Sequence, residues 1–248
     1  MKHWELSDIG KLRKENQDSF QVFEYKAGEE QRIITVAMVC DGMGGAKGGA
    51  IASKLTVEQI AERIKAQKPD MTEARSILSE AVALANHGVF ERSQKDSECS
   101  GMGTTLVAVL TDGERAIVAN VGDSRCYIIR DNSIEQLTKD HSLVEGLVDS
   151  GEITREEARS HPKRNIITRA VGVYEHVECD FYETELHDSC ELLLCSDGLS
   201  GVVEDREMLF EIAQTKQTET AVSRMVNLAL ERGAPDNITA ILLTTELH

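Results

Sequence analysis

The sequence predicts an α+β protein with an antiparallel sheet system and two pairs of helices. The first reason is a pair of consecutive hairpins. Asp112-Gly113 joins one pair of strand-like runs, and Asp131-Asn132 joins the next. Short links with such turn residues are strong hairpin signals, and hairpins connect antiparallel strands. The four runs span residues 103–111, 115–121, 125–130 and 133–137.

The second reason is the grouping of helical patterns, two before the hairpins and two near the end of the chain. Apolar residues recur at helical spacing in each group, and Asp70 with Glu73 resembles a helix-capping arrangement. The helical patterns cover residues 50–66, about 70–93, 206–214 and 218–232. Further strand-like runs cover residues 3–9, 19–25, 33–40, 177–184, 191–195 and 238–245.

The chain of 248 residues contains only three prolines and no low-complexity or linker-like segment. A single α/β or sandwich unit can have this size, so we expect one domain over residues 1–248. Residues 138–164 are polar and weakly helical, with His161-Pro162 as a break. We interpret this region as a flap-like insertion at about 138–170.

The formal net charge is −16, from 43 acidic and 27 basic residues. This balance argues against nucleic acid and anionic membranes as partners, because phosphate contacts need clustered lysine and arginine. The six cysteines form no C-x-x-C pair, which favours reduced, buried thiols and a cytoplasmic location. The charged N-terminus lacks the apolar core of a signal peptide, and no apolar run approaches membrane-span length.

The stretch Val36–Gly49 is the one around which the chain is organised. An apolar strand-like run over residues 33–40 ends abruptly at Asp41-Gly42, and further glycines follow before a helical pattern begins. Glycine lets backbone and ligands approach closely, so a strand delivering a carboxylate here suits a cation. Neither the Walker pattern nor the dinucleotide pattern fits, because Lys47 stands at the wrong place for both.

Four more aspartates occupy similar places at strand boundaries, beside small residues or turn formers. They are Asp18, Asp123, Asp197 and Asp236. If these strand ends share one edge, the carboxylates converge and repel each other unless a cation is present. Oxygen ligands without histidine or cysteine favour Mg²⁺ or Mn²⁺. A single aspartate of this kind is more often a turn residue or a cap, but the repeated context favours a metal site.

Six motifs in order along the chain resemble those of the metal-dependent protein phosphatases (the type 2C family), particularly the compact bacterial serine/threonine phosphatases. Together they span essentially the whole chain, which makes the resemblance specific. The motifs are Ser7–Asp18, Asp41–Gly45, Gly101–Thr105, Gly122–Arg125, Ser196–Gly198 and Pro235–Asn237.

The resemblance implies a central antiparallel β-sandwich flanked by pairs of helices, a four-layer αββα fold, with a binuclear Mn²⁺ or Mg²⁺ centre at one end. Asp41 would bridge the two ions, and the Gly42 carbonyl would complete the ligands of one of them. Asp197 and Asp236 would bind the other ion, and Asp18 would act on the first through water. Asp123 resembles the ligand of a third, weaker ion. Arg13 matches the arginine that binds the substrate phosphate.

Two positions depart from the pattern of some relatives. Gln17 stands where some of them have glutamate, and Met43 stands where the animal enzymes have a histidine proposed as proton donor. Met43 leaves the general acid unassigned. We prefer a metal-bound water, with His161 as a weaker candidate, and we interpret His141 and His161 as surface or flap histidines.

The resemblance implies hydrolysis of phosphoserine and phosphothreonine in proteins by a metal-activated water, opposing a bacterial serine/threonine kinase. We expect a monomer that acts on that kinase and its substrates. Three alternatives stay open: a phosphatase for a phosphorylated anti-sigma antagonist, an inactive binding scaffold, and a structural Mg²⁺ or Ca²⁺ binder. The presence of Asp41, Asp197 and Asp236 disfavours the scaffold.

Overall fold

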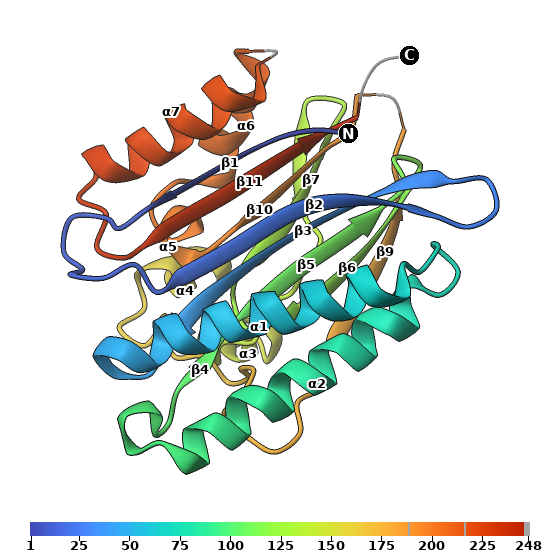
Figure 1. Cartoon of the computed structure of the whole chain (residues 1–248). Helices are drawn as coiled ribbons and strands as arrows, with labels where there is room; N and C mark the ends of the chain where they lie inside the picture. The colour runs from blue at the N-terminus through green and yellow to red at the C-terminus, as the bar shows by residue number, and fades with distance from the viewer. Residues whose placement is uncertain (188, 216, 246–248) are drawn as a thin grey trace.

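Two antiparallel sheets pack face to face, with helices covering both outer faces (Figure 1). The computed structural model describes residues 1–187, 189–215 and 217–245. The first sheet has the order β1-β11-β10-β7-β8 and comprises β1 (Lys2–Asp8), β11 (Ile238–Thr244), β10 (Glu191–Cys195), β7 (Arg125–Arg130) and β8 (Ser133–Gln136). The second has the order β2-β3-β5-β6-β9 and comprises β2 (Asp18–Ala27), β3 (Arg32–Met43), β5 (Leu106–Thr111), β6 (Arg115–Val121) and β9 (Asp180–Glu185). A short β4 (Gly103–Thr104) pairs with β3. The predicted α+β fold with four αββα layers is confirmed.

Strand alternation divides the core into three apolar layers. In β3, Val36, Met38 and Cys40 belong to the cluster beneath the first helix pair, while Ala37 and Val39 belong to the cluster between the sheets. Successive side chains of a strand point to opposite faces, so a strand covered on both sides reads as one continuous apolar run. A third cluster lies under the second helix pair.

Helices α1 (Gly45–Gln67) and α2 (Ala74–Lys95) cover the second sheet, and α1 packs directly on β2 and β3. Helices α6 (Asp205–Ala213) and α7 (Thr218–Glu231) cover the first sheet, where α7 packs on β1 and β11. Two short helical turns, η1 (Ser97–Cys99) and α5 (Asp197–Ser200), complete these regions. None of the helices in the described residues is long and apolar enough to cross a membrane.

Both predicted hairpins form. Asp131 and Asn132 have φ angles of 51° and 55°, the left-handed pair that a two-residue hairpin turn requires. Gly113 in the other turn has a φ of 89°. One turn makes β5 and β6 neighbours in the second sheet, and the other makes β7 and β8 neighbours in the first.

Several expected element boundaries differ from the structure. The first helix begins at Gly45 rather than near residue 50, so the glycine-rich stretch is largely helical and not a connecting loop. The expected strand 103–111 divides at Thr105 into β4 and β5, and the expected strand 177–184 begins only at Asp180. Asp70 accepts hydrogen bonds from the amides of Thr72 and Glu73, which caps a turn before α2 instead of α2 itself.

Residues 138–170 leave the sandwich as a folded excursion with two short helices, α3 (Leu143–Asp149) and α4 (Arg155–Ser160). The two sides of its base are joined, since Thr168 N donates to His141 O at 2.8 Å and Ser142 bridges Ile167. We call this segment the flap. Its base lies next to the β6–β7 connection, because His141 N donates to Gly122 O at 2.9 Å.

Candidate metal centre

The carboxylates singled out from the sequence come together at one end of the sandwich. Strand pairing places Asp18 directly opposite Asp41. Asp197 is the first residue of α5, directly after β10, and Asp123 lies in the β6–β7 connection. A cavity of about 440 Å³ is lined by Arg13, Asp41, Gly42, Asp123, Asp197 and Asp236. Asp18 is the one predicted site residue that does not line this cavity.

The backbone of Asp41 is held by two threonines. Thr105 Oγ1 accepts a hydrogen bond from Asp41 N at 2.9 Å, and Asp41 O accepts from Thr105 N at 2.9 Å and from Thr104 Oγ1 at 2.8 Å. The division of the expected long strand at Thr105 turns these groups toward Asp41. Asp41 therefore leaves β3 at a fixed angle, which keeps its carboxylate in the cavity.

Gly42 is required by the close approach of α1. A Cβ at this position would lie 2.1 Å from Gly49 O, a distance that no side chain tolerates. Gly42 N also donates to Gln17 O at 3.1 Å. The tight contact explains why the helix begins so early, because Gly45 to Gly49 must pass directly over the end of β3. It also holds the Gly42 peptide at the cavity wall.

Asp18 lies behind the cavity and is held by the first sheet. Its Oδ2 accepts from Ser196 Oγ at 2.8 Å and from Thr239 Oγ1 at 2.6 Å. Its Oδ1 is buried without a hydrogen-bond partner in the described residues. Burial raises the pKa of Asp18 to about 7, against the lowering effect of the two hydroxyls. The carboxylate thus links the two sheets directly beneath Asp41.

Electrostatic repulsion is concentrated at this end of the molecule. Burial is the main cause that raises the pKa of Asp41, Asp123 and Asp197, and neighbouring carboxylates raise it further. Asp197 Oδ1, like Asp18 Oδ1, is buried with no partner in the described part of the chain. Buried oxygens without partners and mutually repelling carboxylates are what a divalent cation would satisfy. The donor set, all oxygen, fits Mn²⁺ or Mg²⁺.

Among the described residues, no three acidic, histidine or cysteine side chains are already arranged to hold a metal ion. Arg13 supplies part of the reason. Its Nη2 forms an ion pair with Asp236 Oδ2 at 2.5 Å, and the charges of Asp41 and Asp197 also raise its pKa, after the hydrogen bond to Asp236. The guanidinium therefore pairs with one of the carboxylates that line the cavity.

The Arg13 loop is fixed by the turn before β11. Asn237 Oδ1 accepts from Gln17 N at 2.8 Å, and Asn237 Nδ2 donates to Ile9 O at 2.8 Å and to Glu15 O at 3.1 Å. Gly10 lets the two segments touch, since a Cβ there would lie 2.2 Å from Asp236 O. Arg13 and Asp236 consequently lie on two segments that are held together at the cavity.

His141 is a residue whose role was missed. It lies in the flap, as one of the two expectations had it, but it is buried and not a surface histidine. Gly122 N donates to its Nδ1 at 3.0 Å, which leaves the ring proton on Nε2, 3.1 Å from Asp180 Oδ2. Burial lowers its pKa. The ring thereby joins the flap base to the loop that carries Asp123, whereas His161 lies at the end of α4 and lines neither described cavity.

The αββα sandwich and the acidic cavity at one end of it agree with the resemblance to the metal-dependent protein phosphatases. The family described as Protein phosphatase 2C matches residues 13–242. The chain belongs to this family and is a serine/threonine protein phosphatase.

Relatives and solved structures agree with this assignment. The chain is 38% identical over 244 residues to the serine/threonine phosphatase stp of Listeria monocytogenes, covering 97% of this chain and 94% of that one. A crystal structure of a Staphylococcus aureus serine/threonine phosphatase superposes with a TM-score of 0.91 at 35% identity, covering 99% of this chain and 95% of that one. The catalytic domain of the phosphatase PstP, crystallised with two manganese ions, gives 0.84 at 34% identity, covering 99% and 98%.

Proposed function

We propose that this phosphatase removes phosphate from phosphoserine and phosphothreonine in proteins with two Mn²⁺ or Mg²⁺ ions held at the aspartate-lined cavity. The supporting observation is the convergence of Asp41, Asp197 and Asp236 on one cavity with Asp18 behind them. The relative PstP, which was crystallised with two manganese ions, has the same fold. The proposal extends to a cytoplasmic monomer that opposes a serine/threonine kinase.

Each site residue has one task in this proposal. Asp41, the Gly42 carbonyl, Asp197 and Asp236 would hold the two ions at the cavity, and Asp18 would support them from the layer behind it. Asp123 would hold a third, weaker ion. When bound, the ions lower the pKa of a water molecule and neutralise the phosphoryl charge.

Arg13 is proposed to hold the substrate phosphate. Its planar guanidinium can donate two parallel hydrogen bonds to phosphate oxygens and keeps its charge at any physiological pH. It stands at the cavity mouth already directed toward the carboxylates. Hydrolysis by a metal-activated water forms no covalent phosphoenzyme, so it needs no nucleophilic side chain.

The test is turnover of p-nitrophenyl phosphate and a phosphothreonine peptide with Mn²⁺, Mg²⁺ or EDTA. We expect activity with Mn²⁺, none with EDTA, and a loss of at least about a hundredfold in Asp41→Asn and Asp197→Asn. The Asp123→Asn variant should turn over both substrates more slowly, yet calorimetry should still show two bound ions. Asp131→Asn, in the β7–β8 turn, is the matched control and should behave as wild type. Near-normal turnover in Asp41→Asn would refute the ligand assignment.

A further inference from the structure

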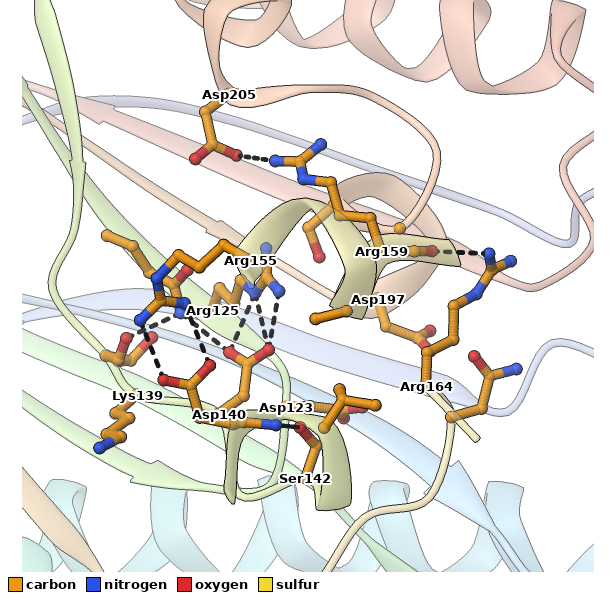
Figure 2. A pocket seen from close by; sticks show the side chains of 18 of the residues that line it. Asp123, Arg125, Lys139, Asp140, Ser142, Arg155, Arg159, Arg164, Asp197 and Asp205 are labelled. Carbon is orange, nitrogen blue, oxygen red and sulfur yellow. Dashed lines mark hydrogen bonds and ion pairs between the residues drawn. The ribbon is translucent and has the colours of Figure 1, made fainter. Parts of the chain in front are cut away.

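A second cavity, of about 690 Å³, adjoins the candidate metal centre beneath the flap (Figure 2). Asp123, Asn165 and Asp197 line both cavities, so the second begins where the first ends. Its outer wall is α4 of the flap, and its inner wall comes from β7 and the start of α6. None of the roles proposed above uses this space.

Cations and carboxylates are nearly balanced around the second cavity. Its described lining contains five cations, Arg125, Lys139, Arg155, Arg159 and Arg164, and six carboxylates, Asp123, Asp140, Glu145, Asp197, Glu204 and Asp205. The chain as a whole has 43 acidic against 27 basic residues. Cations of this lining can attract an anion where they are not already held by a carboxylate.

Two of the arginines are committed to structure. Arg125 binds Asp140 through Nε at 2.9 Å and Nη2 at 2.7 Å, and Arg155 binds Glu145 through its two terminal nitrogens at 3.1 and 3.0 Å. Both carboxylate side chains are only 10% exposed. Two-point pairs with buried carboxylates are the strong kind, so these arginines are not free to turn toward a ligand.

Arg159 and Arg164 are held much more weakly. Arg159 reaches Asp205 through one contact of 3.3 Å, and the two side chains are 49% and 39% exposed. Exposed single contacts contribute little stability. Asp205 also lies 3.5 Å from the Tyr127 hydroxyl, so it keeps a neighbour if Arg159 leaves. Arg164 donates to the backbone carbonyl of Arg159 at 3.0 Å and makes no ion pair with a carboxylate of the described residues.

We propose that Arg159 and Arg164 bind an anionic group of the phosphoprotein substrate, close in sequence to the phosphoresidue. The anion is either an acidic side chain or a second phosphate, and on binding it replaces Asp205 as the partner of Arg159. This inference rests on the proposed function, since the phosphoresidue itself must occupy the neighbouring cavity. The second cavity is thus a specificity site that selects acidic or multiply phosphorylated segments.

The test compares phosphothreonine peptides that differ at one position. The reference peptide has alanines around the phosphothreonine. The two test series carry one glutamate, or one second phosphothreonine, at each of the three positions on either side, and mass spectrometry identifies the product. We expect kcat/KM of the best anionic peptide to exceed that of the reference about tenfold, as one charged pair allows. If only one series is preferred, that series shows whether the anion is an acidic side chain or a second phosphate.

Three variants make the test specific. The preference ratio is kcat/KM for the best anionic peptide divided by kcat/KM for the reference peptide. The double variant Arg159→Gln/Arg164→Gln should reduce this ratio to about one. Asp205→Asn should increase it, because the Asp205 carboxylate no longer competes with the substrate anion for Arg159. Arg224→Gln on α7 removes another exposed arginine, one paired with Glu211, and should change neither the ratio nor p-nitrophenyl phosphate turnover.

The outcomes separate the two proposals. Wild-type turnover of p-nitrophenyl phosphate without any preference for anionic peptides would overturn this inference and leave the proposed function intact. A preference that survives in the double variant would also overturn it. Absence of Mn²⁺-dependent turnover of every substrate would refute the proposed function, and this inference with it.

Discussion

Arg13 and Asp236 form a direct pair across the mouth of the cavity, at 2.5 Å. They are separated by more than 200 positions in the chain, and Asn237 joins their two segments. One residue is proposed to bind phosphate and the other a metal ion. In the absence of substrate, one ion pair therefore joins the proposed phosphate-binding residue to a proposed metal ligand. Breaking this pair should affect phosphate binding and metal binding separately, and both can be measured.

We expect Arg13→Ala to raise KM for a phosphothreonine peptide about tenfold, because a two-point charged contact to phosphate is lost. The variant should bind Mn²⁺ at least as tightly as wild type in calorimetry, since Asp236 is released from its pair. Lysine at this position restores the charge but not the planar fork, so Arg13→Lys should recover only part of the loss. An unchanged KM in Arg13→Ala would remove this residue from the phosphate site.

At the scale of elements, the site depends on how closely α1 passes over the end of β3. Only glycine at position 42 permits this contact, since a Cβ would meet Gly49 O at 2.1 Å. One backbone contact therefore positions the start of α1, the Gly42 peptide and the Asp41 carboxylate.

We expect Gly42→Ala to lower the free energy of unfolding by about 1–3 kcal/mol, as overpacking does, and to reduce turnover because Asp41 is displaced. Gly146→Ala is the matched control. Gly146 lies within α3, and nothing lies within 4 Å of a Cβ built on it. That change should leave stability unchanged or slightly raised. Denaturant unfolding and Mn²⁺-dependent turnover measure both effects, and equal stability of the two variants would contradict the packing argument.

At the scale of the whole molecule, the chain carries a net charge of −16, and several of its carboxylates are buried together at one end of the sandwich. The fold therefore brings like charges out of water. Burial raises the pKa of Asp18 to about 7. The folded protein consequently binds a proton there more tightly than the unfolded chain does.

A raised carboxyl pKa stabilises the fold fully below the unfolded value, and this contribution is lost as the pH rises through the folded value. In EDTA we expect the melting temperature to fall by several degrees between pH 5 and pH 8. Mn²⁺ should reverse the fall at pH 8, because a bound ion stabilises the folded state by mass action. Asp18→Asn should flatten the pH dependence in EDTA. A melting temperature that rises over this range in EDTA would contradict the burial of these carboxylates.

Local physics in the sequence was sufficient to predict most of the fold and the members of the candidate site. Hairpin turns such as Asp131-Asn132 are decided by two residues, and strand alternation is decided by the nearest neighbours. The motif resemblance added the layer order and the proposed role of each aspartate. The structure places Asp41, Asp123, Asp197 and Asp236 around one cavity, as the sequence indicated.

Contacts between distant segments decided the rest. Alternation and turn signals carry no information about how closely α1 passes Gly42, so the helix start at Gly45 was missed. The burial of His141 depends on Gly122 and Asp180, neither of which is nearby in the chain. The sequence by itself determined which side chains stand at strand ends and turns, because those features are local. Only the tertiary structure decided which arginines stay paired and which face an open cavity, because each pairing depends on a partner from another element.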